Sequence, residues 1–202
     1  MLDEIRVGPI TSADGGINPT RGGKTGEVIV TDAHGRYHEA VSRGNCFFAA
    51  NQAAATFAVG LTTTTVTSFA VTNPVGSGKN LSLLQVEFIN NSVIVAVVGL
   101  SVMPISATAV TQNTALVVRN AFIGNGSIGA GLAASGVTFP NAAVVAKALF
   151  ATVSTSTTVT PPPSVYDLGG SILLAPGTAC AVLSNTASTG FISMLWEELP
   201  IV

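Results

Sequence analysis

The sequence predicts an all-β protein built as a β-sandwich, and three observations lead to this prediction. The longest apolar run, residues 81–103, is rich in β-branched side chains, which favour strand over helix. Short apolar segments recur along the chain at spacings of roughly 8–12 residues, divided by small polar residues. No segment has the periodicity of a convincing amphipathic helix. Strands at this spacing are typical of a sandwich or a barrel.

The charged residues are concentrated near the start of the chain and divide it into two regions. Residues 1–45 hold eleven of the eighteen charged residues. Residues 1–26 are also rich in Gly and Pro, so they bury too little apolar surface to become ordered alone. We therefore predict a charged N-terminal arm and hairpin over residues 1–45 and a β-sandwich domain over residues 46–202. The arm is either an extended segment that lies on a neighbouring subunit or another protein, or a floppy tail.

The first expected element is a hairpin over residues 27–41, with strands at 27–31 and 36–41 around a turn at 33–35. Residues 51–55 form a loop or a single helical turn, and residues 124–142, rich in Gly, Ser, Ala and Asn, form a long loop. Residues 143–153 are a strand or a short helix, and Val144-Val145 favours the strand. The remaining strands are expected at 46–50, 56–59, 65–71, 80–90, 92–103, 114–123, 167–174, 178–183 and 191–199.

The apolar run at residues 81–103 has a second interpretation, because a membrane helix needs about 20 consecutive apolar residues. Asn90, Asn91 and Ser92 interrupt the run and leave only residues 93–103 unbroken. We therefore expect two buried strands that meet at Asn90-Asn91 and supply the inner face of the sandwich. No membrane partner is predicted.

The composition points to extensive subunit contacts. Forty-eight per cent of the residues are hydrophobic and only nine per cent are charged, whereas ordinary globular proteins have roughly 25% charged residues. A monomer of this size normally needs surface charge for solubility. We therefore expect much of the surface to be covered by other subunits. The net charge of −2 predicts no nucleic-acid partner.

The patterns that could support catalysis or cofactor binding are incomplete. Residues 22–25, Gly-Gly-Lys-Thr, end like a phosphate-binding loop, but Asn18 occupies the position of its first glycine and a strand follows. The two histidines, His34 and His38, would share a face on a helix, but Gly35 and the expected turn separate them. No nucleophile motif is present, and the adjacent acids Glu197 and Glu198 are expected to point to opposite faces of a strand rather than into one cleft. We predict no enzymatic activity, no catalytic residue, no cofactor and no metal.

Two kinds of side chain are expected to be buried. Cys46 and Cys180 lie far apart in the sequence, and without a visible secretory signal we expect reduced thiols rather than a disulfide. Trp196, beside Met194 in the last strand, is expected in the core or at a subunit interface.

Several stretches resemble virion structural proteins of tailed bacteriophages. Residues 26–45, GEVIVTDAHGRYHEAVSRGN, and residues 73–88, NPVGSGKNLSLLQVEF, share the resemblance. Residues 173–184, LLAPGTACAVLS, and 190–202, GFISMLWEELPIV, are similar to the closing strands of the trimeric jelly-roll domains of those proteins. The resemblance lies in turns and strand spacing, covers about half of the chain and transfers no catalytic residue.

The resemblance implies a jelly-roll-like β-sandwich with an extended N-terminal arm, assembled as a homotrimer. The implied role is a capsid decoration or cement protein on the outer capsid surface of the virion, made in the host cytoplasm and bound to the major capsid protein. The alternative is a tail, baseplate or host-receptor-binding jelly-roll module. Trp196 and Met194 are the candidate trimer-interface residues. The arm's candidate partner-binding residues, whose basic side chains would meet carboxylates, are Arg6, Arg21, Lys24, Arg36 and Arg43.

Overall fold

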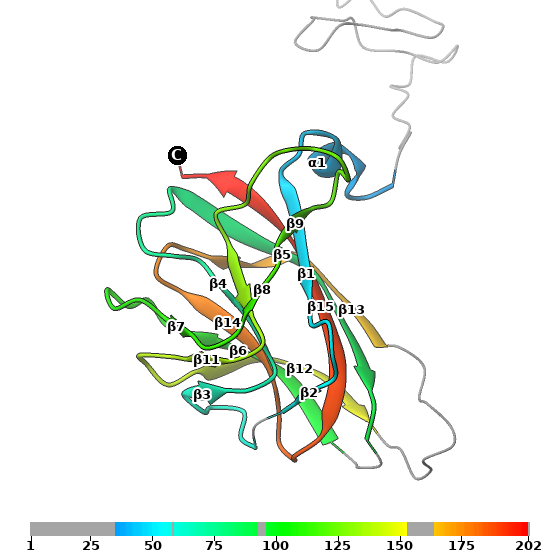
Figure 1. Ribbon diagram of the computed structural model, residues 1–202, viewed down its shortest axis with the longest axis vertical. Helices are drawn as coiled ribbons and strands as arrows, with labels where there is room; N and C mark the ends of the chain where they lie inside the picture. The colour runs from blue at the N-terminus through cyan, green and yellow to red at the C-terminus, as the bar shows by residue number, and fades with distance from the viewer. Residues whose placement is uncertain (1–34, 58, 93–95, 153–163, 202) are drawn as a thin grey trace, which may run out of the picture. The chain divides into compact units, whose positions relative to one another are not determined.

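A computed structural model describes residues 35–57, 59–92, 96–152 and 164–201 (Figure 1). The chain divides into two compact units, residues 1–39 and residues 40–202. The first strand of the expected hairpin and most of the N-terminal arm, including Arg6, Arg21 and Lys24, lie outside the described residues. The β-sheets described below belong to the second unit.

The prediction of a second hairpin strand at residues 36–41 is wrong. The structure has a turn at residues 36–37 and then the short helix α1 (His38–Ser42). Glu39 lies in its first turn, where a negative charge interacts favourably with the positive end of the helix dipole. Gly44, with a φ of +73°, ends the helix. The Gly44 N–H donates to Val41 O at 2.9 Å, and the Asn45 N–H donates to Ala40 O at 3.1 Å. These two hydrogen bonds form a glycine-containing C-terminal cap.

Fifteen strands form three antiparallel sheets within the described residues. The first sheet has the order β13 (Ser164–Leu174), β5 (Lys79–Asn90), β15 (Thr189–Pro200), β1 (Cys46–Ala50) and β9 (Arg119–Asn120), with β2 (Ala55–Thr56) also on β15. The second has the order β12 (Val144–Thr152), β6 (Ala96–Met103), β14 (Ala179–Ser184), β4 (Phe69–Thr72), β10 (Leu132–Ala134) and β8 (Ala115–Leu116). The third is β3 (Thr65–Val66), β11 (Val137–Thr138) and β7 (Thr111–Gln112).

The longer strands pair in a nested order. The first of them, β1, pairs with the last, β15, and β4 pairs with β14. Likewise β5 pairs with β13, and β6 pairs with β12. Successive pairs of the nest alternate between the first and second sheets. Among these eight strands, the chain therefore changes sheet at every step except from β6 to β12.

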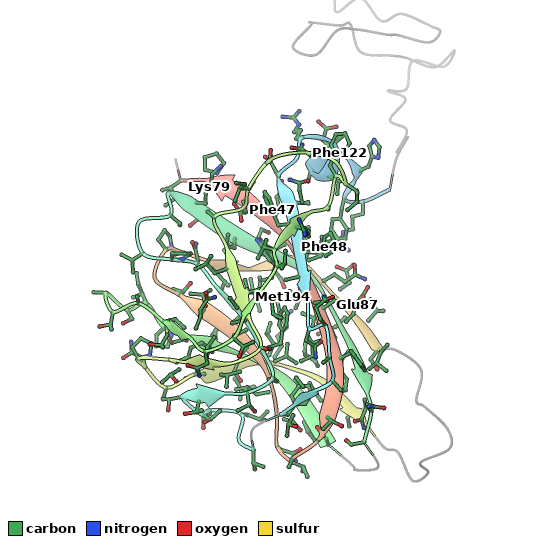
Figure 2. The ribbon with its side chains drawn as sticks, in the orientation of Figure 1. Phe47, Phe48, Lys79, Glu87, Phe122 and Met194 are labelled. Atoms are coloured by element: carbon green, nitrogen blue, oxygen red, sulfur yellow. The ribbon has the colours of Figure 1, made fainter. Side chains whose placement is uncertain are left out.

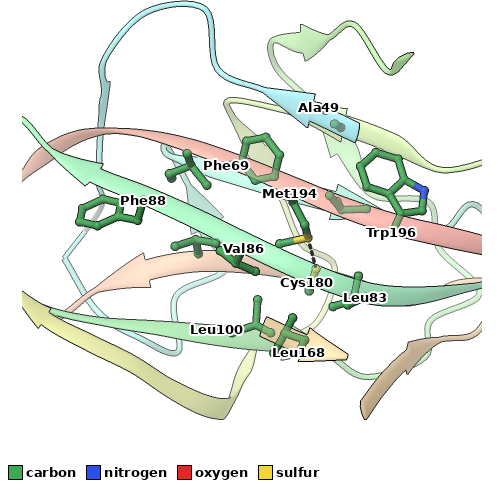
Figure 3. Close-up of a cluster of buried hydrophobic side chains, with 14 of the residues drawn as sticks. Ala49, Phe69, Leu83, Val86, Phe88, Leu100, Leu168, Cys180, Met194 and Trp196 are labelled. Carbon is green, nitrogen blue, oxygen red and sulfur yellow. Dashed lines mark hydrogen bonds between the residues drawn. The ribbon is translucent and has the colours of Figure 1, made fainter. Parts of the chain in front are cut away.

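The core lies between the first and second sheets. In Figure 3, Leu83 and Val86 of β5 and Met194 of β15 face Leu100 of β6 and Cys180 of β14. All five side chains are at most 1% exposed. The predicted all-β sandwich is therefore confirmed, and the apolar run at 81–103 supplies strands to both sheets, with the described ends of β5 and β6 lying on either side of Asn91. No helix among the described residues is long and apolar enough to span a membrane.

A second apolar cluster lies on the other face of the second sheet. It joins Ala70 of β4 and Leu183 of β14 to Val66 of β3 and Val137 of β11, which are all at most 1% exposed. All residues of β4 and β14 are consequently buried, from both sides. The third sheet thus shields the outer face of the second sheet at β4 and β14, whereas Val145 of β12 remains 44% exposed. The strands of the first sheet alternate instead between buried and exposed residues.

Most of the expected strands are confirmed, including those at 46–50, 80–90, 143–153, 178–183 and 191–199, and the expected strand at 65–71 is divided into β3 and β4. The expected strand at 56–59 is described as a strand only at its first residue, in β2, and two further expectations are wrong. Residues 114–123 form the separate strands β8 and β9 rather than one strand, and the expected loop at 124–142 contains β10 and β11. Residues in β10 are a leucine and two alanines, which have weak strand propensity, and their order comes from pairing on both sides with β4 and β8.

Candidate functional site

The outward face of the first sheet is the candidate functional site. Residues directly opposite each other in an antiparallel pair share a face. Glu87 of β5 lies opposite Ser193 of β15, and Ser193 lies opposite Ala50 of β1. Figure 2 shows Phe48 and Glu87 pointing away from the core, whereas Phe47 and Met194 point into it. We call this surface the open face and define it by Phe48, Ala50, Gln85, Glu87, Ile89, Phe191, Ser193 and Leu195.

Two adjoining hollows follow the open face. One has a volume of about 210 Å³ and is lined by Phe48, Leu195 and neighbouring side chains of β5 and β15. The other has a volume of about 290 Å³ and is lined by Ile89, Phe191 and neighbours. Both hollows share Glu87 and Ser193. Ile89 and Phe191 lie directly opposite each other and are 38% and 40% exposed, so the second hollow presents a substantial apolar surface.

The charges of the open face are sparse and lie mainly at its margins. In the centre, the Glu87 Oε2 atom accepts a hydrogen bond of 2.7 Å from the Ser193 hydroxyl. Arg119 lies opposite Phe48 on β9, and Asp167 lies opposite Gln85 on β13. Apolar side chains thus lie on either side of a central Glu87–Ser193 pair, with further charged residues at the rim, and protein–protein interfaces likewise combine apolar and polar contacts. Covering the open face with another polypeptide would bury one central carboxylate, that of Glu87, which already accepts a hydrogen bond from Ser193.

The last strand also carries a buried carboxyl group, on the opposite side from the open face. The Glu198 side chain is 3% exposed. Its Oε2 atom accepts from the N–H of Ala130 at 2.8 Å, and its Oε1 atom accepts from the N–H of Gly131 at 2.9 Å and from Trp196 Nε1 at 3.3 Å. These contacts fasten the glycine-rich segment before β10 to the sandwich. The expectation that Glu197 and Glu198 point to opposite faces agrees with this arrangement, since Glu197 is only half-buried.

The structure corrects the expected trimer-interface residues. Trp196 and Met194 are 0% and 1% exposed and belong to the core cluster (Figure 3). The chain's own side chains already enclose them, so they are core residues and not a contact surface. Of the expected arm residues, Arg36 and Arg43 are described and exposed, and the Arg36 guanidinium lies 5.5 Å from the centre of the Tyr37 ring.

Sequence reasoning did not identify the open face by residue. A signal was present in period-two alternation, which places positions 85, 87 and 89 on one side of their strand and positions 191, 193 and 195 on one side of theirs. The polar residues Gln85, Glu87 and Ser193 fall on these sides, and the residues between them are apolar. The sequence could not show which side of the first sheet stays uncovered. That depends on where the third sheet packs, and its three strands have only two residues each.

The two cysteines are free and buried, as expected, and they lie in different sheets. Burial raises the pKa of the Cys46 thiol to about 11, with a further contribution from the nearby Glu197 carboxylate. Burial also raises the pKa of the Cys180 thiol to about 12. The Cys180 Sγ atom lies 3.9 Å from Met194 Sδ within the core (Figure 3). Both thiols are therefore protonated at neutral pH and are poor nucleophiles in the folded protein.

The raised pKa of Cys180 predicts a loss of stability at alkaline pH. An unfolded thiol ionises near pH 9 whereas the folded one does so near pH 12, so folding is progressively opposed as the pH rises above 9. Between pH 8 and pH 10, the free energy of unfolding should fall by about 1 kcal/mol more in the wild-type protein than in Cys180→Ala. Urea titrations of both proteins at each pH measure this difference. Equal falls in the two proteins would contradict the prediction.

The described residues contain no group of three or more His, Cys, Asp or Glu side chains placed to hold a metal ion. His38 lies in α1, and His34 lies outside the described residues. The chain matches no protein-family model, no curated protein and no solved structure.

Proposed function

We propose that this protein is a non-enzymatic structural component of a tailed-bacteriophage virion, a homotrimer that decorates and stabilises the outside of the icosahedral capsid. The open face carries this proposal. It is a sheet surface with apolar hollows of about 210 and 290 Å³ and one central carboxylate, while the outer face of the second sheet is covered at β4 and β14 by the chain itself. We assign the open face to contacts between copies of this chain.

The strand order supports the jelly-roll part of the proposal. A jelly roll is a long antiparallel hairpin of eight strands rolled into two facing sheets. The nested pairs β1–β15, β4–β14, β5–β13 and β6–β12 have this pattern, with the orders β1-β15-β5-β13 and β4-β14-β6-β12 in the two sheets. The fold is a common scaffold for capsid subunits, but it also serves other functions, so it supports the proposal without deciding it.

The low charge is the second support. Residues 46–202 hold seven charged residues, and one of them, Glu198, is buried within the chain. Such a surface is poorly suited to an isolated monomer and well suited to an assembled particle. In this proposal, the basic residues of the N-terminal arm bind carboxylates of the major capsid protein or of a neighbouring subunit. Preferential binding to the assembled shell then stabilises it without any chemical step.

The number of copies in a particle tests the proposed location. Quantitative mass spectrometry of purified virions from the source should find hundreds of copies, comparable with the main shell protein. Purified protein should also bind to undecorated shells, and a truncation lacking residues 1–34 should bind them more weakly. A few copies per particle would indicate a location in the tail or at a vertex instead of the capsid surface. Absence from the particles would overturn the virion proposal.

The second candidate is a tail, baseplate or host-receptor-binding module. One observation favours it: loops beside the second sheet form a pocket of about 160 Å³ with no charged side chain in its lining, which could receive a small neutral group. Binding of the purified protein to host cells, but not to capsid shells, would favour this candidate over the first.

A further inference from the structure

The loop that joins β9 to β10 carries the one Asn-Gly pair of the sequence, Asn125-Gly126. An asparagine that precedes glycine can react with its own backbone, because glycine has no Cβ atom to hinder the approach of its nitrogen to the side-chain amide. The other eleven asparagines of the chain all precede larger residues. The pair belongs to no helix or strand, and Gly126 is exposed.

Local hydrogen bonds turn the Asn125 side chain toward the backbone that follows it. The Ser127 N–H donates to Asn125 Oδ1 at 2.8 Å, so the side chain folds over the Gly126 peptide. This hydrogen bond also polarises the side-chain carbonyl, and it would stabilise the negative charge that develops on Oδ1 when Cγ is attacked. The Asn125 N–H donates to Phe122 O at 2.9 Å, which holds the turn before the pair.

The attacking group is the backbone nitrogen of Gly126. Its N–H has no hydrogen-bond acceptor within the part of the chain that the structure describes, unlike the N–H groups of Asn125 and Ser127 on either side. The space around Gly126 is open, since a Cβ atom built there would meet no atom within 4 Å apart from its chain neighbours. The nitrogen can therefore lose its proton to hydroxide and move toward Asn125 Cγ without breaking a hydrogen bond of its own.

The nitrogen that would leave, Asn125 Nδ2, lies beside Gly44 at the end of α1. A Cβ atom at Gly44 would lie 2.5 Å from Asn125 Nδ2, so glycine leaves the room that this amide occupies. Asn120 borders the same place, and its Nδ2 atom donates to Gly44 O at 2.7 Å. A reaction at Asn125 would therefore change a side chain that packs against the end of the helix.

We propose that Asn125-Gly126 is a self-modification site, where the asparagine is converted to aspartate and isoaspartate through a cyclic imide. The Gly126 nitrogen forms a bond to Asn125 Cγ and the bond from Cγ to Nδ2 breaks. Nδ2 leaves as ammonia, with a proton from water that replaces the one Gly126 gave up. A water molecule then opens the imide: attack at Cγ gives aspartate, and attack at the main-chain carbonyl carbon of Asn125 gives isoaspartate. Each chain gains one negative charge in a region, residues 46–202, that holds only seven charged residues.

Peptide mass spectrometry of the full-length protein, incubated folded at neutral pH over several weeks, tests this proposal. The peptide that contains Asn125 should gain about 1 Da, the difference between an amide and a carboxyl group. Protein isoaspartate methyltransferase should label the product, because isoaspartate forms through the imide and not by direct hydrolysis of the side-chain amide. Asn141-Ala142 is the internal control, since both residues are exposed but alanine follows the asparagine. Asn125 should react about tenfold faster than Asn141, although Asn125 is less exposed.

Two variants connect the reaction to the structure. Gly126→Ala should slow it about tenfold, and this variant should fold because position 126 is open and its φ lies outside the left-handed region. Asn125→Gln should remove the reaction at this position on the same timescale, since glutamine would have to close a larger ring. Trp196 fluorescence verifies that each variant is folded. The proposal is overturned if Asn125 reacts no faster than Asn141, if aspartate forms without isoaspartate, or if folded Gly126→Ala reacts at the wild-type rate.

Discussion

Replacing Glu198 with alanine is expected to lower the free energy of unfolding by about 3–5 kcal/mol. The substitution leaves three N–H groups, those of Ala130, Gly131 and the Trp196 indole, without their acceptor. It also opens a cavity beside Trp196, which is 0% exposed. Urea denaturation followed by tryptophan fluorescence measures the change, because Trp196 is the only tryptophan in the sequence.

The adjacent acid provides the matched control. Glu197 is half-buried on the other side of the same strand, and Glu197→Ala should change the free energy of unfolding by less than about 1 kcal/mol. If Glu198→Ala were no more destabilising than Glu197→Ala, the proposed fastening of the glycine-rich segment to the sandwich would be wrong.

Replacing Phe191 with aspartate is expected to abolish trimer formation. Phe191 is 40% exposed and lines the larger hollow of the open face, close to Glu87. In an assembled trimer, the new carboxylate would be buried without a partner and beside a like charge, and both effects oppose association. The folded monomer should tolerate the change, because the side chain at this position remains in contact with water. Light scattering after size-exclusion chromatography measures the mass of the variant.

Val145→Asp serves as the control for Phe191→Asp. Val145 is similarly exposed, at 44%, but lies on β12 of the second sheet. Its variant should keep the wild-type mass. The reverse result, in which Val145→Asp dissociates the trimer and Phe191→Asp does not, would place the interface on the second sheet and contradict the assignment of the open face.

The sandwich could be predicted because its strands carry local signals. Residues 46–50 and 191–199 have apolar residues bounded by polar or glycine-containing turns, and both lie within strands of the first sheet. The interruption at Asn90-Asn91 likewise marked the end of β5, and β6 was expected after it. Period-two alternation and turn residues are properties of neighbouring residues, so they can be recognised without knowledge of the tertiary structure.

The elements that were missed depend on distant partners. Helix α1 was expected as a strand, because its end is defined by the backbone hydrogen bonds at Gly44 rather than by apolar periodicity. The strand β10 lies in a segment rich in Gly and Ala, where it is held by β4 and by the Glu198 contacts just before it. Trp196 was a candidate for either core or interface, and only the packing of both sheets around it decides for the core.

The pocket between the loops beside the second sheet, whose lining includes Asn73 and Gln112, could not be predicted either. Asn73 and Gln112 are ordinary turn and loop residues in the sequence, and they come together because β4 and β7 belong to different sheets that meet at this point. Their missing partners become apparent only after every other hydrogen bond has been assigned. Sites of this kind follow from tertiary structure and leave no spacing motif.

The measurement that tests the central claim most directly is the mass of the wild-type protein in solution. Light scattering of the full chain, at protein concentrations from 1 to about 100 µM, should give about three times the chain mass of 20.3 kDa. That result would agree with a trimer assembled through the open face, and loss of the trimer in Phe191→Asp would locate the contact. A mass of 20.3 kDa at every concentration would contradict it, because the open face would then be stable in water without a partner.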